Sequence, residues 1–207
     1  MTTNFWEFPH FQPRLEQDTE LLQQIGFLPG LKEFLMLRQV HALEHGTIWL
    51  LGKGKDDQTL GGLSTDQGFY LYGQVNLDNL QQAVNQALAR FQQGEWDLAI
   101  HPRCGTNLSV AVALGTGLAL GAHLLLPRDL FSQLLGLGLA THLALQLAPS
   151  VGTSTQQYLT TAIPFNLKLN KISLTRDIWG RQAYFVRLDW QESTSPQANL
   201  AAPMLPA

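Results

Sequence analysis

Two uncharged apolar segments, residues 108–126 and 130–148, constrain this chain more than any other feature. Each has nineteen residues and contains no Asp, Glu, Lys or Arg, and Pro127-Arg128-Asp129 separates them. Nineteen helical residues rise about 30 Å, which matches the hydrocarbon thickness of a bilayer. A soluble helix of this length normally has a polar face, and polar residues are few here. The pattern therefore predicts a transmembrane helical hairpin over residues 108–148.

The competing interpretation of these segments is a buried helical pair in a soluble domain, because they are rich in Ala and Gly and poor in Phe and Ile. Small residues recur at four-residue spacing, Gly117 with Gly121 and Gly136 with Ala140, which lets helix backbones approach closely in lipid. We prefer the membrane interpretation on the length criterion. Basic residues flank the segments, whereas the turn has only Arg128 beside Asp129. The positive-inside rule then predicts both ends of the chain on the cytoplasmic side.

The segment His41-Ala42-Leu43-Glu44-His45 has the residues of a metal site. In a helix, positions i and i+4 lie one turn apart on the same face, so His41 and His45 can bind one ion while Glu44 projects from the adjacent turn. This is the inverted H-x-x-E-H arrangement found in a class of metallopeptidases. The alternative is an ordinary polar helix with two unrelated histidines and a solvated glutamate.

A second polar cluster, His101-Pro102-Arg103-Cys104-Gly105-Thr106-Asn107, stands directly before the first apolar segment. Imidazole and thiolate are both good zinc ligands, and the short spacing lets His101 and Cys104 bind one ion from a turn. We expect at least one of them in the same site as His41 and His45. The alternative is an ordinary turn in which Thr106 or Asn107 caps the next helix and Cys104 is inert.

Together the two motifs resemble the YqhQ family of predicted metal-dependent membrane enzymes, in which His-Gly-Ala-Glu-His is followed by His-Pro-Arg-Cys-Gly-Thr and then by transmembrane helices. The segment Gln157-Tyr158-Leu159-Thr160-Thr161 resembles the Leu-Thr-Thr segment of that family's core. The order of the first motif, Phe69 to Gly73 and the second motif is still more similar to a related family of uncharacterised cyanobacterial membrane proteins. The resemblance covers about residues 35 to 165 and implies a metal-dependent activity without naming a substrate. The chain departs from the larger family because no apolar helix precedes the first motif and a charged segment follows the Leu-Thr-Thr region.

Local patterns predict the remaining elements. Residues 31–51 and 78–93 have helical patterns, the second amphipathic and followed by Gly94. Residues 68–75 and 96–100 are predicted strands, and Gly61-Gly62, which no Lys-Ser pair follows, is predicted to be a turn. Residues 165–174 and 181–190 alternate around a turn at 177–180, which predicts a β-hairpin.

The expected fold class is α+β, with a small cytoplasmic unit of helices and sheet joined to the two-helix transmembrane hairpin, and a β-hairpin near the C-terminus. A chain of 207 residues with 45% hydrophobic content can bury such a core. The expected divisions are an irregular N-terminal arm (1–30), the unit with the metal site (31–107), the hairpin (108–148), a polar segment with the β-hairpin (149–190) and a disordered tail (191–207).

We expect a membrane-anchored metalloenzyme, with zinc as the metal and hydrolysis of a peptide or lipid-like bond as its chemistry. His41 and His45 with His101 or Cys104 would bind the ion, and Glu44 would act as general base. Cys104 is alternatively a nucleophile, because the dipole of the following helix favours its thiolate. Arg103, Asn107 and Tyr72 are candidate substrate-binding residues. The sequence does not identify the substrate, which could be a small molecule or a peptide.

A rival function of another class is a non-catalytic membrane assembly or scaffold protein whose metal site is closed and structural. A third option uses His123 and His142 as axial ligands of haem or chlorophyll. His10, a lone histidine in the N-terminal arm, is expected to be solvated. The net charge of −3 excludes a strongly basic nucleic-acid binder. The predicted hairpin leads us to expect membrane lipid and a membrane protein complex as partners. The expected location is a plasma or thylakoid membrane.

Overall fold

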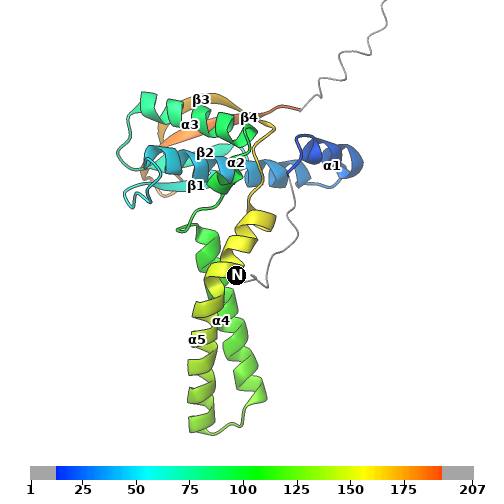
Figure 1. Ribbon diagram of the computed structural model, residues 1–207, viewed down its shortest axis with the longest axis vertical. Coiled ribbons are helices and arrows are strands. Elements are labelled where there is room, and N and C mark those ends of the chain that lie inside the picture. The colour runs from blue at the N-terminus through cyan, green and yellow to red at the C-terminus, as the bar shows by residue number, and fades with distance from the viewer. Residues whose placement is uncertain (1–12, 193–207) are drawn as a thin grey trace, which may run out of the picture.

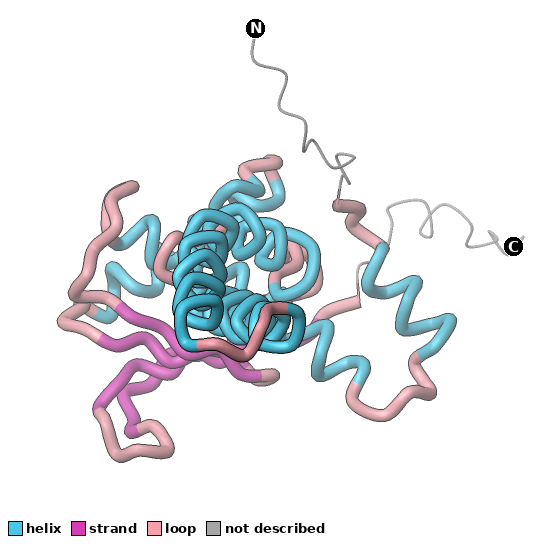
Figure 2. The backbone as a smooth tube through the Cα atoms, turned by 90° about the horizontal axis from the view of Figure 1, so that it is seen from below, coloured by secondary structure: helices cyan, strands magenta, loops and turns pink. Residues whose placement is uncertain are grey.

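The computed structural model describes residues 13–192, which form an α+β head and a helical hairpin that projects from it (Figure 1). The head contains α1 (Gln17–Ile25), α2 (Leu31–Leu51), α3 (Leu77–Gln92) and a four-stranded sheet, and the hairpin consists of α4 (Gly105–Leu125) and α5 (Leu130–Thr155). Figure 2, a view along the hairpin, shows the strands to one side of its two helices. The expected mixture of helix and sheet with two long apolar helices is confirmed.

The sheet joins two strand pairs that are far apart in the chain. Its members are β1 (Gly61–Thr65), β2 (Gly68–Tyr72), β3 (Leu167–Arg176) and β4 (Gln182–Trp190), in the order β1-β2-β4-β3. All neighbours are antiparallel, and β2 pairs with β4 so that Phe69 lies opposite Val186. The predicted C-terminal β-hairpin is therefore confirmed, and it completes the sheet of the head.

Helix α2 is the central element of the head, in contact with α3, β1 and β2. Val40 and Leu43 on α2 pack in one core with Phe91 of α3 and Phe69 of β2, and all four are fully buried. Gly46 allows α3 to approach, because a β carbon there would lie 2.8 Å from the Phe91 ring. Side chains in the middle of α2 are consequently held in a rigid position.

Small residues at every fourth position of α5 form its contact with α4: Gly136, Ala140, Ala144, Ala148 and Gly152 are its buried residues. This spacing places them on one face of the helix, so the two backbones approach closely. The predicted pair Gly136 and Ala140 lies in this interface. Gly117 and Gly121 do not, since a β carbon at either would meet nothing within 4 Å.

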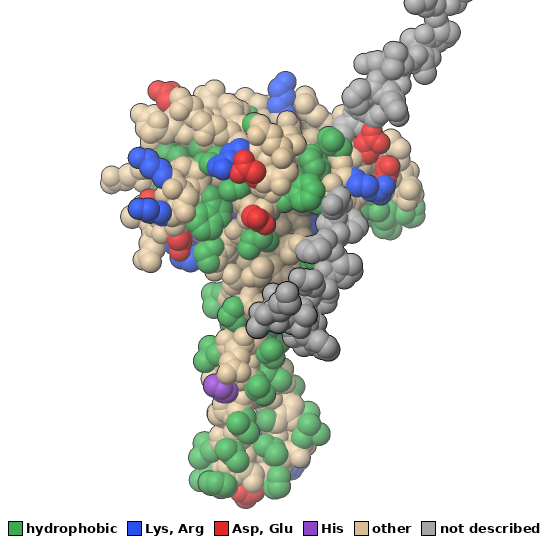
Figure 3. Space-filling view, viewed as in Figure 1, with side chains coloured by type: hydrophobic (Ala, Val, Ile, Leu, Met, Phe, Trp, Pro, Cys, Tyr) green, Lys and Arg blue, Asp and Glu red, His purple; other side chains and the backbone are tan. Residues whose placement is uncertain are grey.

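Apart from this contact face, the hairpin exposes apolar side chains. Figure 3 shows them as green patches along both helices, whereas most charged side chains in this view lie on the head. No residue of α4 is buried. By length and composition both helices could cross a membrane.

Four predictions about local structure need correction. Residues 17–25 of the expected irregular arm form α1, and Gly61 and Gly62 begin β1. Residues 96–100 do not form a strand: Trp96–Ala99 is a 3-10 turn, η1, because it lies beside α2 and its backbone bonds are local. The second helix of the hairpin does not end at residue 148: α5 runs through Pro149, stays packed on α4 up to Gly152 and continues into a π turn, η2 (Gln156–Thr160). His10 and residues 193–207 lie outside the described residues.

Candidate metal centre

Helix α2 and the start of α4 bring three potential metal ligands together. The ligand atoms of His41, His45 and Cys104 all lie within 4.8 Å of one another, and His41 Nε2 is 3.2 Å from Cys104 Sγ. Ligands at zinc bond lengths of 2.0 to 2.3 Å in a tetrahedral sphere are about 3.5 Å apart. The three side chains are therefore close enough together to hold one metal ion.

Both histidines are oriented by the backbone. His41 Nδ1 lies 2.9 Å from the carbonyl oxygen of Thr160, and His45 Nδ1 lies 2.6 Å from that of Ala99. A carbonyl can only accept, so each Nδ1 carries the hydrogen and each Nε2 keeps its lone pair. Metal-binding histidines are typically held by a hydrogen bond of this kind, which sets the tautomer and the ring orientation.

Cys104 is buried and caps α4, with its Sγ accepting a hydrogen bond from the backbone N–H of Thr106 at 3.4 Å. Burial acts to raise the pKa of this thiol, but the hydrogen bond and the charge of His45, when its ring carries both hydrogens, and the bonds from Thr106 outweigh burial and lower the pKa. The N-terminal end of a helix also favours negative charge. The thiolate, which is the form that binds metals, is thus stabilised.

Glu44 lies in the same cavity wall as the three ligands but outside their group. It is only 6% exposed, and the hydroxyl of Ser64 on β1 donates a hydrogen bond to its carboxylate. Burial raises the pKa of Glu44, while the Ser64 bond and the charge of His41 act in the opposite direction. Gly62 makes room for this carboxylate, because a β carbon at that position would overlap it.

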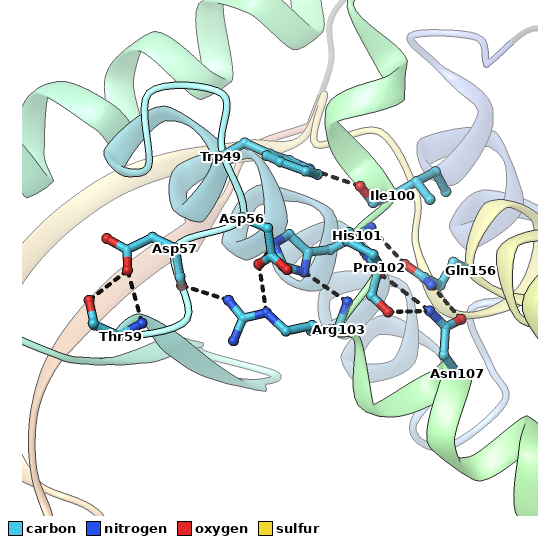
Figure 4. Close-up of polar contacts among 10 residues, drawn as sticks. All are labelled: Trp49, Asp56, Asp57, Thr59, Ile100, His101, Pro102, Arg103, Asn107 and Gln156. Carbon is cyan, nitrogen blue, oxygen red and sulfur yellow. Dashed lines mark hydrogen bonds and ion pairs between the residues drawn. The ribbon is translucent and has the colours of Figure 1, made fainter.

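His101 is not brought into the group of three ligands, and its ring nitrogens lie beside other groups. Its Nδ1 accepts from the backbone N–H of Arg103 at 3.3 Å, so the hydrogen lies on Nε2, 3.8 Å from the Asp56 carboxylate. Burial, His45 and Arg103 lower the pKa of His101 to about 4 although Asp56 opposes them, so the ring is neutral at pH 7. Its own backbone N–H donates to Gln156 (Figure 4).

The three candidate substrate-binding residues have structural contacts of different kinds. Arg103 lines the cavity and holds the loop before β1, with bonds of 2.6 Å to Asp56 and to the carbonyl of Asp57 (Figure 4). Asn107 instead connects α4 to η2 by accepting from Gln156 at 2.8 Å. The structure does not bring Tyr72 to this cavity, because its hydroxyl donates to Asp177 in the turn before β4.

The two histidines of the hairpin, His123 and His142, lie apart from the metal centre. Each is hydrogen-bonded to another residue of the hairpin. His123 Nδ1 lies 2.9 Å from Gln133 Oε1, and His142 Nε2 lies 2.9 Å from Gln146 Nε2. These contacts link α4 to α5 and one turn of α5 to the next.

Sequence reasoning missed the residues that support the site. They are Ser64, the buried Gln156 and the carbonyls of Ala99 and Thr160, all of which lie outside the two motifs, although Ala99 is only two residues before the second one. The only signal among them was the Leu-Thr-Thr segment, whose Thr160 supplies a carbonyl to His41.

Fold and site together define a class: an α+β head with a His-His-Cys cluster at the base of two long apolar helices. The chain belongs to the family described as Domain of unknown function (DUF6391), which matches residues 36–172 and so includes the cluster and both helices. It is 48% identical over 198 residues to an uncharacterized protein of the cyanobacterium Picosynechococcus sp. (strain PCC 7002), covering 91% of this chain and 97% of that protein. No solved structure matches. The resemblance to a cyanobacterial family is thus supported, whereas the comparisons do not show a link to the YqhQ family.

Proposed function

We propose that this protein is a membrane-anchored metal-dependent hydrolase whose zinc ion is bound by His41, His45 and Cys104. The observation that carries the proposal is the shared tautomer of the two histidines. Both Nδ1 atoms donate to backbone carbonyls, so both Nε2 lone pairs are available beside the Cys104 sulfur. Unrelated polar histidines would not be expected to share this arrangement.

The number of ligands favours a catalytic site over a structural one. Within residues 13–192 the cluster contains three ligands, and catalytic zinc sites typically have three protein ligands and an open fourth position. Zinc in such a site supplies Lewis acidity and lowers the pKa of water at the open position to about 7. A closed structural site would need a fourth protein ligand. His101 does not supply it in this tautomer, because its Nδ1 accepts the Arg103 N–H and its Nε2 carries a hydrogen.

Glu44 is the base of the proposed reaction. Its carboxylate lines the same cavity and is kept in place by Ser64. It accepts a proton from the attacking water as the new bond to the substrate carbonyl carbon forms. It then returns that proton to the leaving oxygen or nitrogen as the old bond breaks, so an acid and an alcohol or amine are released. Burial brings the pKa of Glu44 closer to neutral, which suits a group that both accepts and donates.

The exposed surface of the hairpin supports a membrane anchor. The core helix of a soluble protein is mostly buried, yet α4 has no buried residue and α5 buries only its small residues. Large exposed residues such as Leu124 and Leu145 need an apolar solvent. The excess of basic residues on the head side supports a cytoplasmic position of the head, next to a plasma or thylakoid membrane.

The test uses the full chain purified in detergent without chelators. We expect about one zinc per chain, and hydrolysis of p-nitrophenyl acyl esters that Glu44→Gln abolishes while zinc stays bound. Glu33→Gln, on the exposed face of the same helix, is the matched control and should change neither value. A structural site predicts bound zinc and no dependence of any activity on Glu44. Absence of zinc contradicts the proposal, and a visible haem or chlorophyll band would support the pigment alternative.

A further inference from the structure

The cavity that holds the metal ligands is lined by both polar and apolar side chains. It has a volume of about 700 Å³ and lies between α2, β1 and the segment before α4. Polar side chains of its lining include the three metal ligands, Glu44, and also Arg38, Ser64, His101 and Arg103. Six large apolar side chains line it as well: Phe34, Leu37, Ile48, Leu60, Leu63 and Leu159. We call Phe34 and Leu37, which precede His41 on α2, together with Leu159 of η2 the apolar end.

The mouth of the apolar end is exposed. Phe34 is 47% exposed, Leu37 is 37% exposed and Leu159 is 59% exposed. The turn before α2 adds two more exposed apolar residues, Phe27 and Leu28. Single exposed apolar residues are ordinary, but several at the rim of a cavity are typical of a binding surface for an apolar molecule.

This mouth lies where the hairpin joins the head. Gly105 and Thr106 at the start of α4 and Leu159 and Thr160 at the end of η2 all line the cavity. Figure 1 shows that both ends of the hairpin meet the head. Leu108, about one turn further along α4, is exposed and extends the apolar surface onto the hairpin. If the hairpin spans a bilayer, the mouth is at the membrane surface, and a lipid chain reaches it without crossing water.

We infer that the site takes a membrane amphiphile. The long hydrocarbon chain of the amphiphile lies against Phe34, Leu37 and Leu159, and its polar headgroup lies beside His41 and Cys104. The approach from the bilayer rests on the membrane anchor of the proposed function, and the chemistry at the polar headgroup rests on its metal centre. A peptide fits the apolar end less well, because its backbone needs hydrogen-bond partners that Leu and Phe side chains cannot provide. The cavity volume is within the usual range for ligand pockets, about 300 to 1,000 Å³.

The test is photo-cross-linking of the full chain in lipid nanodiscs with a palmitate analogue that carries a mid-chain diazirine. We expect label in the peptide that contains residues 31–51, and competition by excess palmitate but not by acetate. Label in the peptide that contains residues 130–148 comes from bulk lipid and serves as the internal standard. The ratio of the two labels is therefore the measured quantity.

Phe34→Ser combined with Leu159→Ser should reduce this ratio about tenfold, since each change removes an apolar contact with the chain. Both residues are exposed, so the head should keep its fold, and circular dichroism checks this. Leu174→Ser with Ile178→Ser, equally exposed on the far β-hairpin, is the matched control and should leave the ratio unchanged.

Zinc content measured on the same samples separates this inference from the proposed function. Specific label in a zinc-free protein supports the amphiphile site and contradicts the hydrolase. Bound zinc with label only in the hairpin overturns the amphiphile site and leaves the metal centre standing. An unchanged ratio in the folded double variant also overturns it.

Discussion

His41 Nε2 lies 3.2 Å from Cys104 Sγ, although 63 positions separate the two residues in the chain. The contact joins the centre of the buried helix α2 to the first residue before α4. It therefore couples the head to the base of the hairpin through the candidate metal centre. A bound ion should stabilise the arrangement of both parts, because it binds the folded chain only.

Removing one ligand of this contact should remove the metal. We expect Cys104→Ser and His41→Ala to weaken zinc binding by more than about a hundredfold, since loss of even a supporting hydrogen bond costs about 10- to 100-fold. Competition with a zinc-binding dye measures the affinity. His123→Ala, in the distant hairpin, is the control and should bind zinc as the unchanged protein does. Equal affinity of the Cys104→Ser protein would mean that the thiol is not a ligand.

The fold should require glycine at position 62 of β1, because the Glu44 carboxylate lies against it. Gly62→Ala places a methyl group where the Glu44 carboxylate lies, so we expect destabilisation by about 1 to 3 kcal/mol. Gly61→Ala is a matched control one residue away, because a β carbon there meets nothing within 4 Å. Thermal unfolding in detergent compares the two. If both variants unfold at the same temperature, the close approach of Glu44 to β1 is wrong.

The hairpin offers a similar pair of glycines. A β carbon at Gly152 would overlap the side chain of Asn107, whereas one at Gly138 would meet nothing within 4 Å. Gly152→Ala should therefore loosen the contact between α5 and the start of α4, at a cost of about 1 to 3 kcal/mol. Gly138→Ala should be neutral or slightly stabilising, because Ala favours the helix. A Gly152→Ala protein as stable as the Gly138→Ala protein contradicts this packing.

Asp177 should give the turn before β4 a pH-dependent stability. Burial acts to raise the pKa of Asp177, but bonds from the Tyr72 hydroxyl and from Arg181 lower it to about 2, below the ordinary 3.8. The ionised carboxylate thus stabilises the fold above about pH 4, and this contribution disappears as the pH falls through about 2. Tyr72→Phe removes one donor and should raise this pKa toward its ordinary value. An NMR titration of the carboxyl carbon measures it, and an unchanged pKa in Tyr72→Phe is the contrary outcome.

Elements whose pattern is local could be predicted from the sequence. The helix predicted over residues 31–51 has the bounds of α2, and the alternation after residue 165 predicted the β3–β4 hairpin. The hairpin predicted to end at residue 148 extends through Pro149 in the structure, because packing of Ala148 and Gly152 on α4 offsets the backbone donor that proline lacks.

The site could be predicted only in its ligand types. Two histidines one turn apart and a nearby cysteine indicate a metal site in any chain. The sequence could not show whether Cys104 or His101 joins His41 and His45 as a metal ligand. The answer depends on which backbone group is hydrogen-bonded to each imidazole ring. Arg103 donates to His101, whereas the carbonyls of Thr160 and Ala99 accept from His41 and His45. Such contacts exist only once the chain has folded.

The most direct test of the central claim is the X-ray absorption spectrum of zinc in the purified full chain. The proposed site predicts one sulfur ligand at about 2.3 Å and nitrogen or oxygen ligands at about 2.0 to 2.1 Å, with imidazole scattering from two rings. Cys104→Ser should remove the sulfur signal. A protein that retains no zinc, or whose zinc has no sulfur neighbour, would contradict the His41-His45-Cys104 centre.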